Sequence, residues 1–367
     1  MLLVVVAPIA LRLLRANTED FGYFYSAANA MRHGEDIYRA AEGNYIYPPL
    51  LAFLFQPLTF LPERGAMAVW LVISAASIVT AVFIAANEAA MRWLPIEPQF
   101  HRDHVWGIAG IALLLNVDKL HKTFGLGQTD SLIVLAGALV LCWMNRRPAL
   151  AGIAIGASAN IKYLTLIFVP YFLLKRNFRA ALSSIVSFVF FLALPAVEIG
   201  LERATHYAME AFSALGRMIG LTSAKQTVQI FSVTWHRSVS ITSAVFRLTR
   251  SQGLSDLLAV GLTLLAFAVI MAAIVFAARR NGVRIFDRDS ASERLVSLEW
   301  AVLIFLALAF SPQTSSRHMI LALLIYVLAV AIYFAQPARG PRILLAVAGI
   351  IFALSLSFPL GGRSSHA

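Results

Sequence analysis

Long apolar segments separated by short polar ones run along almost the whole chain. Seven of these segments approach the roughly 20 apolar residues that cross a bilayer. They are residues 66–91, 124–144, 180–197, 254–278, 295–310, 318–334 and 343–358. Shorter apolar stretches occupy residues 1–14 and 105–117, and two more lie within 149–174. The pattern predicts an all-α polytopic membrane protein with about eleven transmembrane helices, forming one domain over residues 1–367.

Composition supports this class. Apolar residues make up 59% of the chain and charged residues 13%, whereas soluble domains carry roughly 25% charged residues. The net charge is +11, but Lys and Arg are scattered between apolar segments instead of forming a patch. These values exclude a soluble enzyme, a disordered protein and a nucleic-acid-binding protein. The single cysteine, Cys142, lies in an apolar segment, so the chain has no disulfide framework.

Short basic segments set the predicted orientation, because cytoplasmic loops of membrane proteins are rich in Lys and Arg. Residues 145–148 and 175–179 are both basic, so both are expected on the cytoplasmic side. The intervening residues 149–174 must therefore enter the membrane and return, and they are long enough only for two half-height helices. We expect the break between these helices at Asn160–Lys162, which places Lys162 at membrane depth.

The same rule places residues 92–104, 279–294 and 335–342 inside. Arg12 and Arg15 follow the apolar stretch of residues 1–14, whereas a signal peptide carries its positive charge before that stretch. We therefore expect residues 1–14 to be a first transmembrane helix, with the N-terminus inside and the C-terminus outside.

Two large segments are then expected outside, residues 15–65 and 198–253. Within the first, residues 46–62 are too short and too interrupted by proline to span, so we expect a juxtamembrane helix in the outer interface. Within the second, Ala204–Ile219 has the apolar spacing of a helix lying on the membrane surface.

The first outer segment begins with acidic and aromatic residues beside the first helix. One interpretation makes Asp20 a general base at the membrane surface. The structural alternative makes Glu19 and Asp20 solvated caps of the next helix.

A second polar cluster combines basic residues with a glycine-rich turn. We expect Asp118–Thr123 to form a short outer loop, with Lys119, His121 and Lys122 beside the turn at Gly125–Gln128. Glycine lets backbone N–H groups approach an anion, and a helix N-terminus favours one, so the cluster is suited to a phosphate. The alternative is a basic loop that reaches toward lipid head groups.

Two further places carry candidate chemistry. Lys162 is a candidate because burying an ionisable side chain in a membrane is energetically unfavourable and is rarely found without a function. The alternative is that the long Lys162 side chain reaches out to the interface. Arg317 and His318 supply cationic donors after the turn at Ser311–Ser316, where the alternative is a capped helix start. Asp287–Asp289 matches a metal–nucleotide motif, but it lies among arginines on the expected cytoplasmic side, so we interpret it as a solvated loop.

Several short motifs follow one another along the chain in a specific order. They are Asp20-Phe21, Tyr25-Ser26-Ala27-Ala28, Tyr47-Pro48-Pro49-Leu50, Pro57-Leu58, Leu61-Pro62, Gly127-Gln128, Ala151-Gly152 with Gly156 and Lys162, and Ser311-Pro312 with His318. With these motifs the chain resembles glycosyltransferase family eighty-seven of the GT-C superfamily over residues 20–320. That family includes polyprenyl-phosphate-mannose-dependent mannosyltransferases. One departure is Arg317-His318, where the family often has an aromatic residue and paired histidines.

The resemblance implies a GT-C fold with juxtamembrane helices in the first outer loop and an active site facing away from the cytoplasm. It implies a polyprenyl-phosphate sugar as donor, for which we expect mannose, and a glycolipid or polysaccharide as acceptor. A single carboxylate base then deprotonates the acceptor hydroxyl, and direct displacement inverts the anomeric carbon. The leaving phosphate needs cations rather than a proton, so this chemistry requires neither a metal nor another cofactor.

The resemblance and the clusters together give a set of expected roles. We expect catalytic roles for Asp20 and His318, binding of the donor phosphate by Lys119, Lys122, Lys162 and Arg317, and substrate contacts from Tyr25, Tyr47, His121 and Gln128. We expect the protein in a bacterial plasma membrane, with this site on the periplasmic side.

Two other functions fit parts of the sequence. A flippase of lipid-linked sugars would need charged residues along a full-height path, together with repeat symmetry. An O-antigen-ligase-like transferase would use a pyrophosphate donor and the basic residues of segment 198–253. The polar clusters gather at the expected outer ends of the helices, which favours an enzyme over a flippase.

Overall fold

The computed structural model describes residues 19–95, 98–218, 228–286 and 292–337, with single positions at 9, 340, 343 and 349. Throughout these ranges the regular structure is helical, and no strand occurs in them. The predicted first and last transmembrane helices, 1–14 and 343–358, and the segment Asp287–Asp289 lie outside the described ranges.

The helices follow one another in a simple order. They are α2 (Glu19–Arg32), α3 (Ile37–Ala40), α4 (Pro49–Phe55), η1 (Gln56–Phe60), α5 (Glu63–Trp93), α6 (Pro98–Leu115), α7 (Val117–Leu126), α8 (Asp130–Trp143), α9 (Pro148–Ala159), η2 (Tyr163–Ile167), α10 (Phe168–Leu174), α11 (Phe178–Ala193), α12 (Ala196–Ile199), α13 (Leu201–Met218), α14 (Ile241–Ser251), α15 (Asp256–Arg280), α16 (Glu293–Phe310), η3 (His318–Leu321) and α17 (Ala322–Ala335).

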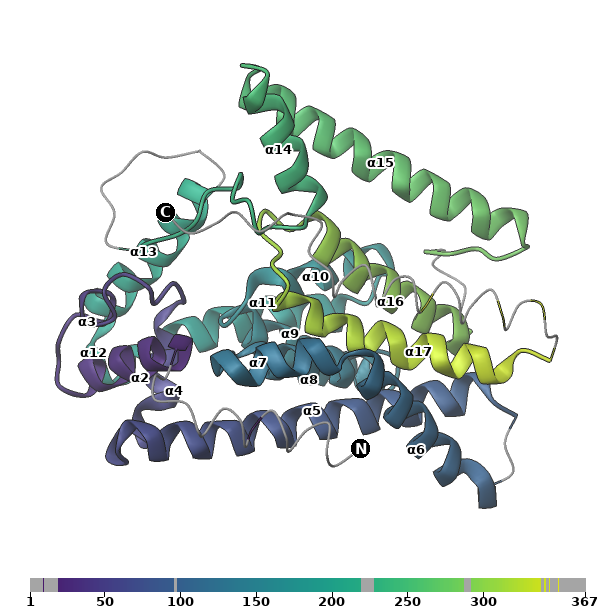
Figure 1. Cartoon of the computed structure of the whole chain (residues 1–367), viewed down its shortest axis with the longest axis horizontal. Coiled ribbons are helices and arrows are strands. Elements are labelled where there is room, and N and C mark those ends of the chain that lie inside the picture. Colours follow the sequence, from purple (N-terminus) through teal and green to yellow (C-terminus); the bar gives the residue numbers. More distant parts are fainter. Residues whose placement is uncertain are drawn as a thin grey trace.

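The centre of the molecule is a bundle in which α5 packs against α8 and α17, and α9 packs between α8 and α11 (Figure 1). Small residues bring α9 and α11 together, since a Cβ at Gly152 or Gly156 would overlap Ser183 or Ser187 of α11. Such close approach suits helices in lipid, where association depends on packing rather than on the hydrophobic effect. Trp300 of α16 is fully buried against α8 and donates its ring N–H to the Gly137 carbonyl at 2.9 Å.

The helix break predicted at Asn160–Lys162 is confirmed, because α9 ends at Ala159 and η2 begins at Tyr163. The side chain of Asn160 holds the break by donating to the carbonyls of Gly156 (2.9 Å) and Phe188 (3.0 Å). The loops on either side of this stretch, residues 144–147 before α9 and 175–177 after α10, lie side by side.

The contact that joins those loops runs from the Asn177 side chain to the Met144 carbonyl, at 3.2 Å. The chain between them therefore leaves one end of the bundle and comes back to it, as the basic segments predicted.

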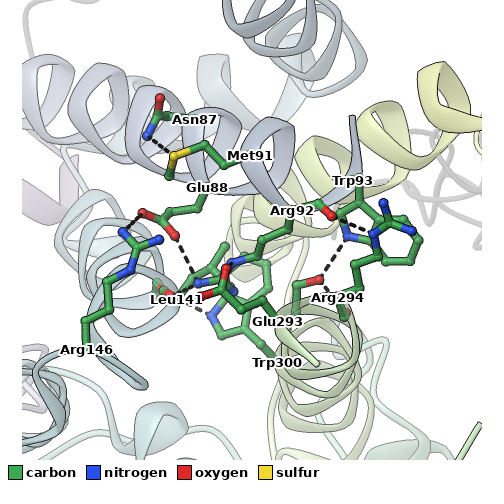
Figure 2. Close-up of polar contacts among 12 residues, drawn as sticks. Asn87, Glu88, Met91, Arg92, Trp93, Leu141, Arg146, Glu293, Arg294 and Trp300 are labelled. Carbon is green, nitrogen blue, oxygen red and sulfur yellow. Dashed lines mark hydrogen bonds and ion pairs between the residues drawn. The ribbon is translucent and has the colours of Figure 1, made fainter. Parts of the chain in front are cut away.

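A buried polar network closes the same end of the bundle, where α5, α8 and α16 meet (Figure 2). Arg92 bonds to the Glu88 carboxylate at 2.9 Å and to the Leu141 carbonyl at 2.8 Å. Arg146 contacts Glu88 at 3.4 Å, and Arg294 donates to the Arg92 carbonyl at 2.7 Å. Parts of four segments predicted to lie inside, around residues 92, 146, 177 and 294, thus share one end of the molecule.

The opposite end gathers α2, α3, α4, α12 and α13, at the left of Figure 1. The Tyr38 hydroxyl donates to the Tyr207 carbonyl at 2.8 Å, and the Tyr207 hydroxyl donates to the Glu35 carbonyl at 3.3 Å. The two large segments predicted to lie outside therefore pack against each other. Helix α13 confirms the helix predicted from Ala204, and α4 with η1 gives residues 46–62 a short helix that turns at Pro57.

Four described helical stretches are long and apolar enough to cross a membrane: Glu63–Trp93, Phe178–Ile199, Asp256–Arg280 and His318–Ala335. The predicted total of about eleven spans and the interfacial position of α4 stay predictions. Helix α15 stands apart from the bundle at the top of Figure 1, with Ala259 as its buried residue.

Candidate functional site

Helix α2 places Asp20 at its first turn, facing the bundle. Glu19 is exposed, whereas Asp20 is partly buried, which matches the choice of Asp20 over its neighbour. The helix is anchored by Phe21 and Phe24, which are almost fully buried and both contact the ring of Phe55 in α4. The carboxylate therefore sits on a rigid element at the end where the two large segments meet.

Asp20 contacts two residues that are distant in sequence. Arg317 donates to its Oδ2 at 2.6 Å, and the side chain of Gln128 donates to the same oxygen. The side chains of Asp20 and Arg317 are each 26% exposed, so the ion pair stands at the edge of the protein interior. Burial raises the pKa of the Asp20 carboxyl above its ordinary value, and the positive charges of Arg317 and Lys162 partly oppose this rise.

Gln128 reaches Asp20 because of the turn between α7 and α8. Gly127 ends α7 in the left-handed conformation, with φ of +66°, which glycine adopts without strain. Trp70 of α5 fixes this turn by donating to the Gly127 carbonyl at 2.9 Å. The turn thereby brings Gln128 up to the carboxylate.

Lys162 lies at the break after α9 and is paired with a carboxylate that the sequence reasoning had not singled out. Its ammonium donates to Asp130 Oδ1 at 2.7 Å. Asp130 is the first residue of α8 and is fully buried, and the Lys162 side chain is 10% exposed. Lys162 therefore points into the protein, and the alternative of a side chain that reaches to the interface is wrong for this structure.

The basic cluster at residues 118–123 forms a helix rather than the expected loop, since all six residues belong to α7. This helix buries Leu120, Thr123 and Phe124, and its charged residues lie at helical spacing. Asp118 accepts from Lys119 at 2.9 Å and from Lys122 at 3.0 Å.

Both ammonium groups also donate to the Ser316 hydroxyl, each at 3.1 Å. Because Ser316 directly precedes Arg317, the lysine pair is tied to the same turn that supplies the arginine on Asp20.

His318 is held by that turn as well. Its Nδ1 accepts the Ser315 backbone N–H at 3.0 Å, which leaves the proton of a neutral ring on Nε2. The ring is then a neutral hydrogen-bond donor at Nε2 instead of the cationic donor expected from the sequence.

Three expected substrate-contact residues make no hydrogen bond to Asp20 among those described. Tyr25 donates to the Leu61 carbonyl at 2.8 Å, and Tyr47 is buried against the rings of Phe24 and Tyr45. His121 is half-buried on α7. Gln128 is the one residue of the expected substrate set that contacts Asp20 among the described hydrogen bonds.

The residues brought together are thus one carboxylate, Asp20, with Arg317, Lys162 and Gln128, from four separate segments. Asp130 and Ser316 were missed as partners, and the signal for Asp130 was its place two residues after Gln128, at the start of the next helix. In the described part of the chain, no three His, Cys, Asp or Glu side chains gather as a metal site would require. The site thus combines a carboxylate that can accept a proton with cations that can stabilise a neighbouring anion.

Comparison with known proteins gives the same family as the sequence motifs. The sequence model of Glycosyltransferase family 87 matches residues 45–312, well over half of the chain. The chain belongs to this family. Asp20, Arg317 and His318 lie outside the matched residues, so their roles depend on the geometry described above.

Individual relatives are distant. Over 148 residues the chain is 26% identical to a polyprenol-phosphate-mannose-dependent alpha-(1-2)-phosphatidylinositol mannoside mannosyltransferase of Mycobacterium tuberculosis strain H37Rv, covering 39% of this chain and 34% of the relative. It is 23% identical over 245 residues to the corresponding pentamannoside enzyme of strain CDC 1551, covering 61% and 50%.

A third relative has another sugar in its name. The alpha-(1->3)-arabinofuranosyltransferase of Corynebacterium glutamicum is 26% identical over 186 residues, covering 49% of this chain and 42% of the relative. In all three comparisons, the chain spans half of the relative's length or less. No solved structure matches the chain.

Proposed function

We propose that the protein transfers a sugar, with mannose as the first candidate, from a polyprenyl-phosphate donor to a hydroxyl of a glycolipid or polysaccharide. The observation that carries the proposal is the meeting of Asp20 with Arg317 at 2.6 Å, in a site that also holds Lys162. The relatives support the donor class, since two of them carry polyprenol-phosphate-mannose in their names.

In the proposed reaction, the acceptor oxygen attacks the anomeric carbon from the face opposite the phosphate. The new carbon–oxygen bond forms as the bond to the phosphate oxygen breaks, and the configuration inverts. The acceptor proton passes to the Asp20 carboxylate, and polyprenyl phosphate leaves with the bonding electrons. The leaving phosphate gains one negative charge, which Arg317 and Lys162 are placed to stabilise.

Arg317 has a second part in this proposal. In the structure its guanidinium bonds to Oδ2 of the Asp20 carboxylate, the group that accepts the proton in this reaction. A donor phosphate offers the guanidinium a stronger acceptor, because planar Arg–phosphate contacts are charge-assisted and often bidentate. Donor binding then draws Arg317 off Asp20, and the carboxylate, still bonded to Gln128, gains a free acceptor position for the acceptor hydroxyl. His318 supplies a neutral N–H donor beside it, and the Lys119–Lys122 pair adds positive charge at the same turn.

Basic residues of the segment 198–253 give little support to the ligase-like alternative. Arg203 donates to the Gly34 carbonyl, Arg247 to those of Trp235 and Ser238, and Arg250 pairs with Asp256. The contacts of Arg247 and Arg250 are local, Arg203 reaches the first outer segment, and none of the three contacts Asp20 among the described hydrogen bonds.

The test is purified protein in lipid with a panel of polyprenyl-phosphate sugars. Asp20→Asn keeps the size and hydrogen bonding of the side chain but removes the base, and should lower the transfer rate by about 10²–10⁴ with donor binding retained. Glu19→Gln, one residue away and exposed, is the matched control and should cost little. Turnover by Asp20→Asn within a few-fold of wild type would show that another group is the base.

A further inference from the structure

The turn between α7 and α8 supplies two partners to the site, Gln128 on Asp20 and Asp130 on Lys162. We infer that Asp130 is a positioning residue, which holds the Lys162 ammonium at the start of α8, two residues from the Gln128 that contacts Asp20, so that the ammonium meets the phosphate of the donor. The inference rests on the proposed function and names a residue that the proposed chemistry does not itself require.

The pair is not an ordinary surface contact. Asp130 is 0% exposed, and the Nζ–Oδ1 distance of 2.7 Å is that of a strong, charge-assisted hydrogen bond. Burying two charges costs much of what their attraction returns, so such a pair is weak evidence of a purely stabilising role. The presence of the Asp130–Lys162 pair is therefore better explained by a role of Lys162 in ligand binding.

The helix break that carries Lys162 is held by other residues. Asn160 donates to the Gly156 carbonyl of α9 and to the Phe188 carbonyl of α11, and the Ser158 hydroxyl donates to Thr165 Oγ1 beyond the break at 3.1 Å. The Asn160 bonds fix the end of α9 against α11, the Ser158–Thr165 bond links the two sides of the break, and none of these contacts involves a charge. The lysine and its carboxylate are therefore additions to a break that is already supported.

The geometry of an ammonium explains what Asp130 adds. Lys162 has three N–H donors on a flexible stem, and Asp130 accepts one of them. Two donors are then left for a ligand, and the charge of the ammonium lowers the pKa of the Asp20 carboxyl. A lysine without this partner would gain rotamer freedom and could turn its charge away from the phosphate.

Asp130 also has a buried second oxygen, Oδ2, which has no hydrogen-bond partner in the described residues. Unpaired buried acceptors are uncommon and expensive. A carboxylate that served only to stabilise the fold would be expected to use both oxygens. In Asp130 only Oδ1 accepts a described hydrogen bond, and its donor is Lys162, as expected of a residue that directs this lysine.

The experiment measures equilibrium binding of a polyprenyl monophosphate, thermal stability, and the KM of donor and acceptor separately. Asp130→Glu keeps the charge but moves the carboxylate by one methylene. We expect it to weaken binding of the polyprenyl monophosphate and raise the donor KM by at least about tenfold, because a charge-assisted contact is displaced. The acceptor KM should not change.

The matched control is a second buried lysine–carboxylate pair in the described residues, Lys175 with Glu299, at 2.8 Å. This pair lies at the opposite end of the bundle, where the Glu299 side chain also bonds to Tyr171 and to the Phe286 backbone. Glu299→Asp should lower thermal stability and leave the binding of polyprenyl monophosphate unchanged. If Asp130→Glu behaves in the same way, the inference is wrong and the pair is structural.

A second variant covers failure of Asp130→Glu to fold. Asp130→Asn combined with Lys162→Gln replaces the ion pair by a neutral hydrogen-bonded pair, so neither partner is left as an unpaired charge. This double variant should fold and lose donor affinity by a similar factor. Wild-type donor affinity in the folded double variant would also overturn the inference. Wild-type protein that binds no polyprenyl monophosphate would instead overturn the proposed function, and the inference with it.

Discussion

Gly127 lies so close to Phe21 that a Cβ added at residue 127 would sit 2.7 Å from the Phe21 Cβ. The contact joins the turn that carries Gln128 to the helix that carries Asp20. Glycine is required there twice, for the close approach and for the positive φ.

Gly127→Ala should therefore push α2 away from the α7–α8 turn. We expect the Asp20–Gln128 contact to be lost and the transfer rate to fall by roughly 10²-fold, as expected for a small misplacement of a catalytic group. The measurement is the rate per folded protein, with melting temperature recorded in parallel. Gly253→Ala is the control, because Gly253 also has a positive φ but has open space around it. Equal rates for the two variants would contradict the explanation.

The ion pair on Asp20 predicts a pH effect. Arg317 lowers the pKa of Asp20 against the larger effect of burial, so Arg317→Gln should raise that pKa further. The active form of the base is the carboxylate, which is lost as pH falls through its pKa. The acid limb of kcat/KM should therefore move to higher pH in Arg317→Gln.

The control for this profile is Arg247→Gln, since Arg247 bonds to backbone carbonyls away from Asp20. Its acid limb should coincide with that of wild type. An unshifted acid limb in Arg317→Gln would mean that the guanidinium does not tune the base.

The polar network at the other end of the bundle predicts a stability effect without a catalytic one. Glu88→Gln leaves Arg92, whose side chain is 1% exposed, without its nearest carboxylate (Figure 2). Breaking a buried pair in this way costs about 3–5 kcal/mol. We expect a lower melting temperature with unchanged donor KM. Glu202→Gln, at an exposed position of α13, should change neither value.

The orientation predicted from basic segments has a direct test. After Cys142 is replaced by Ala, the variants Arg39→Cys and Asn145→Cys place single thiols at exposed positions near opposite ends of the bundle. A membrane-impermeant thiol reagent added to intact cells should label residue 39 and spare residue 145. Labelling of residue 145 alone would reverse the orientation and place the site inside.

Sequence patterns predicted the elements of this fold well and their pairing poorly. The break near Asn160 could be found because two basic segments bracket a stretch too short for two spans. Helix α7 was mistaken for a loop because charge was given more weight than the spacing of Leu120 and Phe124.

The partners of the site residues could not be predicted in the same way. Lys162 meets Asp130 across 32 positions and Asp20 meets Arg317 across 297, and neither distance leaves a periodic signal. Single residues whose burial is energetically unfavourable, such as a lysine at membrane depth, could be recognised as candidates. The groups that hold them depend on how the helices pack.

The weak packing of helix α15 limits what a melting curve can report about this protein. Because it buries so little against the bundle, the free energy that a melting curve reports comes from the other helices. Damage to α15, by mutation or by loss of surrounding lipid, should pass unnoticed in a thermal shift measured on protein in detergent. A preparation can therefore show a sharp thermal transition while α15 is displaced. Activity after reconstitution into a bilayer is the better test that the whole protein is intact.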